Sequence, residues 1–247
     1  RVEAVEEVVA RLEPPLEVDV VDRLASLVDK SLVRSVDDPG GQRLAMLETI
    51  REYALERLEE ESGFSSAARR AHAEYFSELV SSRRGRLHGP QREDTLEELA
   101  AELGNALAAW RFWVGAGDLE KLNELLDGLW VLHDARGWYQ GAVDLAKDLL
   151  GVLSAVPSTP DRAQEKIAVG TSLARGLMAI RGYTAEVEEA HSRALALLEE
   201  AGGVRQRFPV LRSLASFHLY RGEFDKAAAV GRELLDLAGS RTTWASR

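Results

Sequence analysis

The stretch that decides the fold is "VLRSLASFHLYRGEFDKAAAVGRELLDLA", Val210 to Ala238. Its apolar residues recur three and four positions apart on both sides of Gly222, which predicts two amphipathic helices joined by a tight turn. Small Ala215 and Ala227 are expected where the helices approach each other, and Phe224 is expected to fill the space between them. Such a hairpin leaves an apolar face bare, so neighbouring hairpins must cover that face.

The same turn signature occurs twice more upstream. Arg-Gly followed within two residues by an aromatic recurs at Gly137 and Gly182, so the three glycines stand at intervals of 45 and 40 residues. Intervals of this size are typical of stacked helical hairpins. Further turns are predicted at 115–118, 157–161 and 201–203. We therefore expect a mainly α protein with an array of antiparallel helix pairs over residues 91–247, the alternative being an irregular helical bundle.

The first 62 residues carry a different pattern. Two apolar stripes at helical spacing, over 2–12 and 18–28, flank Pro14 and Pro15. "SLVRSV" (31–36) and "RLAML" (43–47) then alternate apolar and polar residues around "DDPGG", which predicts a β-hairpin, and a helix follows. Helix, helix, hairpin, helix is the order in the latter part of a winged-helix domain, where the hairpin is the wing. Residues 1–62 are therefore expected to be a winged-helix-like domain.

A connecting segment over 63–90 is expected between these two parts. A helical pattern runs from Ser65 to Val80, and "SSRRGRLHGP" (81–90) then breaks it with two glycines and a proline. The basic cluster in and beside this segment is the one place where an anion could dock, although a solvated linker explains the same residues. The cluster comprises Arg83, Arg84, Arg86 and Arg92, with His88.

Composition limits the classes of function. The 247 residues carry a formal net charge of −10, which disfavours non-specific binding to nucleic acid by the whole chain. No cysteine is present, so disulfides and thiolate metal sites are excluded and a reducing cytoplasm is expected. No apolar run reaches the roughly 20 residues of a membrane helix. Because the start lacks both an initiator methionine and a signal sequence, we expect a piece of a longer protein.

Several motifs in order carry a family resemblance. Leu27–Val33 ("LVDKSLV"), Met46–Leu58 ("MLETIREYALERL") and Arg70–Phe76 ("RAHAEYF") lie in sequence, followed by a helix with Asn105, Ala109 and Trp110. This series resembles the end of the nucleotide-binding module of bacterial STAND-class (NB-ARC-like) transcriptional regulators. The resemblance covers roughly residues 1–150. The remainder resembles tetratricopeptide-like (TPR) hairpins, which implies a right-handed α-superhelix.

The resemblance implies a regulatory mechanism. In such proteins the winged-helix domain packs on an NTPase module and holds an ADP-bound closed state, and a signal read by the helical array releases it for ATP binding and oligomerisation. ATP or ADP is expected only in that upstream module, because this chain has no G-x-x-x-x-G-K-[ST] phosphate loop. Related proteins place a histidine between a methionine and an acidic residue to contact ADP. Here Leu47 stands between Met46 and Glu48, so no cofactor-binding residue is assigned.

Sequence-specific DNA binding through the winged helix is the alternative function, with the helix around 18–30 in the major groove and the wing, 37–41, on the backbone. Between Pro15 and Glu61, however, the sequence holds six basic residues and twelve carboxylates. Phosphate contacts dominate affinity for DNA, so this acidic segment favours packing against protein.

No catalytic or metal-binding grouping is found. The five histidines show no ligand spacing, and His133 and His218 are expected in the core because each lies four residues before a turn glycine. Trp110, Trp113 and Trp130 are expected to form the first core layer of the array, the alternative being the floor of a ligand pocket. A hydrolase built on paired carboxylates has no supporting spacing.

The predicted function is therefore that of a non-catalytic sensor that binds a protein, peptide or small effector. In a TPR-like superhelix the first helix of each hairpin lines a concave groove. By helical phase, the residues predicted to face that groove are Asp127, Val131 and Asp134 from one repeat and Arg212, Ser216 and Tyr220 from another.

Overall fold

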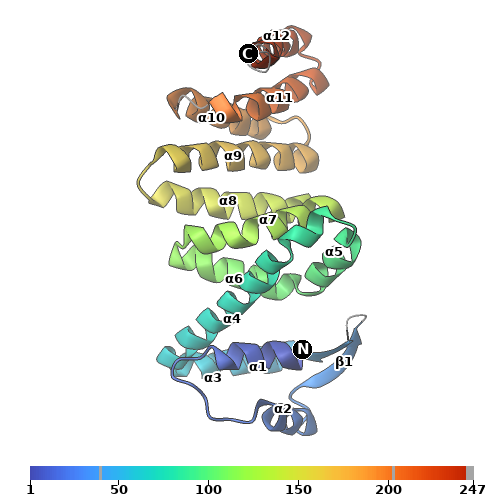
Figure 1. The fold of residues 1–247 in the computed structure, drawn as a ribbon, viewed down its shortest axis with the longest axis vertical. Coiled ribbons are helices and arrows are strands. Elements are labelled where there is room, and N and C mark those ends of the chain that lie inside the picture. The colour runs from blue at the N-terminus through green and yellow to red at the C-terminus, as the bar shows by residue number, and fades with distance from the viewer. Residues whose placement is uncertain (39–40, 202–203, 243–247) are drawn as a thin grey trace. The chain divides into compact units, whose positions relative to one another are not determined.

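The computed structural model describes residues 1–38, 41–201 and 204–242. It is mainly α-helical with one two-stranded antiparallel sheet, as the sequence predicts (Figure 1). The elements are α1 (Val2–Ala10), α2 (Val20–Asp29), β1 (Arg34–Asp38), β2 (Gly41–Ala45), α3 (Glu48–Glu60), α4 (Ser62–Ser82), the 3-10 helix η1 (Arg84–His88), α5 (Arg92–Ala101), α6 (Leu103–Ala116), α7 (Leu119–Arg136), α8 (Tyr139–Ala155), α9 (Pro160–Arg181), α10 (Ala185–Ala201), α11 (Val204–Tyr220) and α12 (Phe224–Thr242).

The chain forms two compact units, Arg1–Leu129 and Trp130–Arg247. The helix predicted to connect two domains, α4, belongs to the first unit, where it packs against α1, α3 and α6. None of the described helices is both long and apolar enough to cross a lipid bilayer.

The hairpin forms as predicted but begins later along the chain. Asp19 caps α2 by accepting a hydrogen bond from the Asp22 amide at 3.0 Å. The amides of Ser31 and Leu32 still bond to carbonyls of α2, and Ser31 adopts a left-handed φ of 57°, so extended backbone starts only at Arg34. In the antiparallel register Arg34 pairs with Ala45. The wing tip, Pro39 and Gly40, and the turn glycines Gly202 and Gly203 lie outside the described residues.

The segment predicted as a solvated linker is ordered. The 3-10 helix η1 contacts both α4 and α5, and its Leu87 is completely buried. Leu87 explains why the sequence pattern misleads: a single apolar residue among arginines and glycines fixes this turn without producing any helical periodicity.

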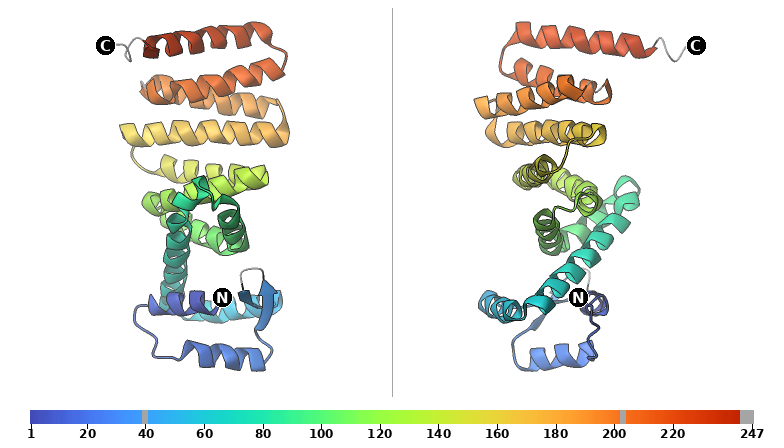
Figure 2. Two further views of the ribbon diagram at one scale, coloured as in Figure 1. Left: turned by 45° about the vertical axis from the view of Figure 1, so that its right-hand side comes forward. Right: turned by 90° about the vertical axis from the view of Figure 1, so that its left-hand side faces the viewer.

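The helices of the second unit follow one another as antiparallel neighbours, with α9 in contact with α8, α10 and α11 (Figure 2). The predicted turns at Gly117, Gly137, Gly182 and Gly222 are present, each with a left-handed φ. At three of them the amide just after the glycine bonds to the carbonyl five residues back, as in a Schellman motif: Asp118 to Trp113, Trp138 to His133 and Glu223 to His218.

The core confirms most of the predicted packing. Trp110 and Trp113 are buried, and the Trp113 indole donates to the Ser77 hydroxyl at 2.9 Å, whereas Trp130 is only partly buried. His133 and His218 are also buried. Ala215 and Ala227 are both partly buried on the packed helices α11 and α12.

The role predicted for Phe224 is wrong, because its side chain is 67 % exposed. The buried aromatic of this hairpin is Phe217, which lies on α11 and packs with Val143, Leu177 and Val187. Phe224 is the first residue of α12, which packs on α11, and so it lies at the end of the hairpin instead of between its helices.

Candidate functional site

The first unit presents an uncovered apolar surface over residues 16–53. Among the described residues up to 64, only Leu12 and Val33 are buried, and helices α1, α2 and α3 contain no buried residue. The apolar stripe of α2 is thus left partly in solvent, with Val21 52 % exposed. The large apolar side chains exposed in this segment are Leu16, Val18, Val21, Val28, Leu32, Val36, Leu47 and Tyr53. Val21 and Val28 lie seven residues apart and so on one face of α2, and an exposed apolar helix face is typical of a surface that contacts another protein.

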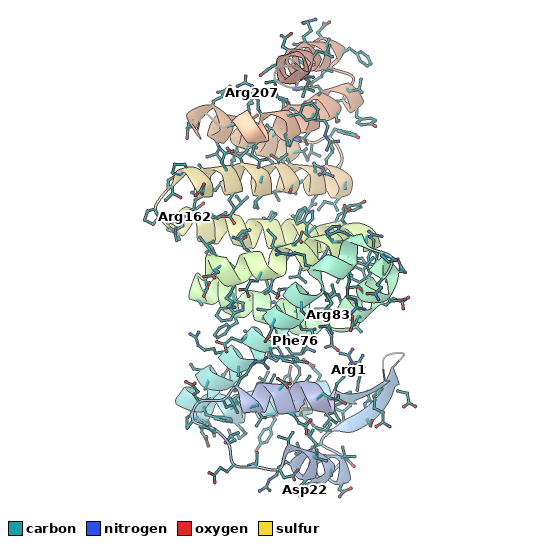
Figure 3. All side chains as sticks on the ribbon, viewed as in Figure 1. Arg1, Asp22, Phe76, Arg83, Arg162 and Arg207 are labelled. Carbon is teal, nitrogen blue, oxygen red and sulfur yellow. The ribbon has the colours of Figure 1, made fainter. Side chains whose placement is uncertain are left out.

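A nearly buried carboxylate ties the hairpin to the helices behind it. Glu102, at the start of α6, is 8 % exposed and pairs with Arg43 of β2 at 3.2 Å and with Arg1 at 3.5 Å. The Asn105 amide donates to its second oxygen at 2.7 Å. Arg1 and Phe76 (Figure 3) line a pocket of about 250 Å³ beside this group. His72 lines it too, and burial lowers the pKa of its imidazole, while a hydrogen bond that the ring donates to Asn105 partly opposes that shift.

The arginines of the predicted anion patch are paired with carboxylates of the same unit. Glu98 accepts a hydrogen bond from Arg83 at 3.1 Å and forms an ion pair with Arg86 at 3.3 Å, and Arg84 pairs with Asp127 at 3.0 Å. Arg92 begins α5 and is exposed. The cluster thus braces η1 against α5 and α7, and an external anion would compete with these carboxylates.

The predicted groove residues divide between the two units. Asp127 lies in the first unit, while partly buried Val131 and exposed Asp134 lie on α7 in the second. Arg212, Ser216 and Tyr220 follow one another by single helical turns along α11, and the Ser216 hydroxyl donates to the Arg212 carbonyl at 3.0 Å. The exposed Tyr220 ring stacks on Tyr183 with centroids 5.5 Å apart. The predicted common groove for all six residues stays a prediction.

A pocket of about 440 Å³ lies between α8, α9 and α10 of the second unit. Its floor is apolar and its rim carries Lys147, Lys166, Glu186 and the Arg193–Glu189 ion pair of 2.5 Å. Sequence reasoning missed this pocket. The signal that could have indicated it is a set of small residues one helical turn apart on α10, Ala190 and Ala194, opposite Gly170 of α9.

The buried histidines have structural partners. His191 is 1 % exposed; its Nδ1 donates to the Val187 carbonyl at 2.9 Å, so in the neutral ring Nε2 accepts from the Ser213 hydroxyl at 2.9 Å. Burial lowers the pKa of His191. Within the part of the chain that the structure describes, no three His, Cys, Asp or Glu side chains are placed to hold a metal ion.

Comparison with known proteins finds distant relatives. Proteins of Mycobacterium bovis and of two strains of Mycobacterium tuberculosis, provisionally named HTH-type transcriptional regulators, are each 29% identical to the chain over 230 residues. The match covers 89% of this chain but 24% of each relative, so the chain spans about a quarter of their length. No family model matches the sequence, and no solved structure matches it. The chain is therefore similar, along most of its length, to one part of these long mycobacterial proteins.

Proposed function

We propose that the chain is the regulatory segment of a STAND-type transcriptional regulator. Its winged-helix-like part, α1 to α3 with the hairpin, docks on an NTPase module elsewhere in the same polypeptide, and its TPR-like helices over residues 91–247 bind an effector. The names of the mycobacterial relatives support a role in transcription, and their greater length leaves room for further modules. The chain itself performs no chemistry.

The observation that carries the docking proposal is the uncovered apolar surface over residues 16–53. Burial of apolar area contributes about 25 cal/mol per Å², and a segment with two buried side chains gains little of it alone. A folded partner that covers Val21 and Val28 of α2 supplies the missing burial. An NTPase module in the same polypeptide suits this role because its effective concentration is high.

Docking can be tested with substitutions on α2 in the full-length regulator. Val21→Gln combined with Val28→Gln removes apolar contacts without adding charge, and we expect the closed state to be lost, so that bound ADP exchanges faster and the target promoter responds without signal. Arg23→Gln is the matched control, since Arg23 is exposed on a different face of the same helix. Unchanged ADP exchange in the double variant would contradict the docking proposal.

Sequence-specific DNA binding is the second candidate, favoured by the helix–helix–hairpin–helix order and by the HTH-type names of the relatives. Against it, the helix that would enter the major groove exposes Asp22 and Asp29. Fluorescence anisotropy of promoter fragments with this chain at low salt, about 50 mM, distinguishes the two. We expect no saturable change, and a salt-sensitive, sequence-dependent rise would favour DNA binding instead.

The absence of a phosphate loop from the sequence predicts that nucleotide binding resides outside this chain. Calorimetry of the chain with ATP or ADP is expected to give no heat of binding. Micromolar affinity for either nucleotide would show that the site lies at least partly within these residues.

A further inference from the structure

The pocket between α8, α9 and α10 combines an apolar floor with the cationic side chains of Lys147 and Lys166. On α9 the lining residues Lys166, Gly170, Leu173 and Leu177 follow the spacing of a single helix face. Along that face, the rise from Lys166 to Leu177 is about 16 Å. The other apolar residues of the floor come from α8 and α10 and are Leu150, Ala190, Ala194 and Leu197.

The charges of the rim are unevenly paired. Arg193 is held by Glu189 at 2.5 Å, which leaves little net charge on that part of α10. Among the described residues, neither Lys147 nor Lys166 takes part in an ion pair within 4.0 Å. Glu186 also lines the pocket but lies near the start of α10, whereas Leu197 lies near its end. Because α9 and α10 are antiparallel neighbours, Glu186 lies toward Leu177 and away from Lys166.

We propose that this pocket binds a small amphipathic monocarboxylate, with its hydrocarbon chain along Leu173 and Leu177 and its carboxylate between Lys147 and Lys166. The volume of about 440 Å³ lies within the range of about 300–1,000 Å³ of known ligand pockets. A largely apolar lining with few polar groups is the usual composition of such sites, and here two of the polar groups, Lys147 and Lys166, are cations without an ion-pair partner in the described part of the chain. The inference deepens the proposed function, on which it rests for its biological role, by naming the effector class of the helical array.

The probes are saturated compounds with the same ten-carbon chain and different head groups, each kept below its micellar concentration. Titration calorimetry with the chain is expected to show one decanoate per chain, weaker binding of decanol and the weakest binding of decyltrimethylammonium. Shortening the carboxylate to octanoate and hexanoate should weaken binding about fourfold for each methylene removed, because each buried methylene contributes about 0.8 kcal/mol.

Matched substitutions separate the head group from the tail. Lys147→Gln combined with Lys166→Gln should weaken decanoate binding by about two- to fivefold per lysine, as for partly exposed ion pairs, and leave decanol unchanged. Gly170→Leu should fill the pocket and weaken both compounds. Arg175→Gln is the control: Arg175 is exposed on α9, nine residues after Lys166 and so on the opposite side of the helix, and it does not line the pocket.

Three results would overturn the proposal. These are the absence of decanoate binding at millimolar concentration, equal affinity for decanoate and decyltrimethylammonium, and an Arg175→Gln effect as large as that of the double lysine variant. Because the assay measures binding by this chain alone, its outcome is independent of the promoter and ADP measurements that test the proposed function. Circular dichroism of each variant establishes that a lost affinity is not lost folding.

Discussion

At the scale of single residues, close helix contacts in this protein depend on glycines. A methyl group added at Gly176 of α9 would lie 2.8 Å from a Val143 methyl, and one added at Gly128 of α7 would lie 2.5 Å from a Val80 methyl. Both distances are shorter than carbon atoms tolerate without moving. These glycines stay in helices, where they are otherwise unfavourable, because no other residue lets the neighbouring side chain approach so closely.

Gly176→Ala is therefore expected to destabilise the second unit. Displacing Val143, which belongs to a buried cluster with Leu177 and Phe217, should cost about 1–3 kcal/mol. Gly170→Ala on the same helix is the control, because its new methyl would meet Ala194 at an ordinary 3.8 Å and should stabilise the helix by up to about 1 kcal/mol. Urea denaturation measures the free energy of unfolding of both variants, and an equal change in the two would refute the close-contact explanation.

His191 predicts a pH dependence of stability. Burial lowers the pKa of its imidazole from the unfolded value of 6.5, so the unfolded chain takes up a proton first as the pH falls. The contribution of neutral His191 to the free energy of unfolding is complete above pH 6.5. It is lost as the pH falls from 6.5 toward the lower pKa that His191 has in the folded protein. His191→Gln should reduce the stability difference between about pH 7.5 and about pH 5.5.

Urea denaturation of the His191→Gln variant at both pH values checks this, with exposed His88→Gln as the matched control. A pH dependence identical to that of the unsubstituted chain would contradict a role for His191.

At the scale of elements, the wing is held by charge more than by apolar packing. In β2 no residue is fully buried, yet Arg43 reaches the nearly buried carboxylate of Glu102 at the start of α6. Arg1 adds a second cation from the residue before α1. One carboxylate thus links the hairpin and α1 to the start of α6, and a change at Glu102 alters several elements together.

Glu102→Gln should loosen the hairpin selectively. The variant keeps the shape but removes the charge that attracts Arg43 and Arg1, at a cost of about 1–3 kcal/mol for charged hydrogen bonds. Hydrogen exchange of the β1 and β2 amides should accelerate, while that of α9 should not change.

Glu98→Gln is the matched control, since Glu98 pairs with two arginines, Arg83 and Arg86, which lie in the same unit but outside the two strands. Faster exchange of the hairpin in both variants would mean that general destabilisation explains the result and that Glu102 has no special role.

The sequence predicts local patterns here better than it predicts where distant segments meet. The periodicity of apolar residues locates the helices, and Arg-Gly followed by an aromatic residue locates the turns at Gly137, Gly182 and Gly222. Both signals can be read because they depend on neighbouring positions. The pairing of Glu102 with Arg43 joins residues far apart in the chain, and η1 depends on one buried leucine, so neither leaves a periodic trace. The pocket between α8, α9 and α10 arises from small residues on separate helices, which sequence spacing alone does not bring together.

At the scale of the whole molecule, burial is distributed very unevenly along the chain. The described residues up to 64 contribute two buried side chains, whereas α8 alone contributes seven. Local free energies of opening follow buried contacts, so the stability of the two regions should differ even within one polypeptide. This asymmetry is what a segment built to be covered by another module would show.

Native-state hydrogen exchange should therefore find two levels of protection. Amides of α1, α2 and α3 are expected to exchange at least about tenfold faster than those of α8 and α9, which corresponds to about 1.4 kcal/mol of local stability. In the longer regulator that we propose, the amides of α2 should exchange more slowly, while those of α8 serve as the internal reference. Equal protection of α2 and α8 in the isolated chain would contradict the unequal burial.

The recurring glycine turns have a consequence for how such a chain changes over generations. Three turns, at Gly117, Gly137 and Gly222, close through the same local bond, so each of these helices carries its own stop signal within its last residues. A recombination event with breakpoints at Gly137 and Gly222 joins like helix ends and adds or removes an even number of helices, α8 to α11, which leaves the remaining helices antiparallel to their neighbours. Gly182, with φ 70° and ψ −148° and a bond to Met178, is built differently, and a breakpoint there would join unlike ends. Length variation among related genes should therefore concentrate at the other junctions.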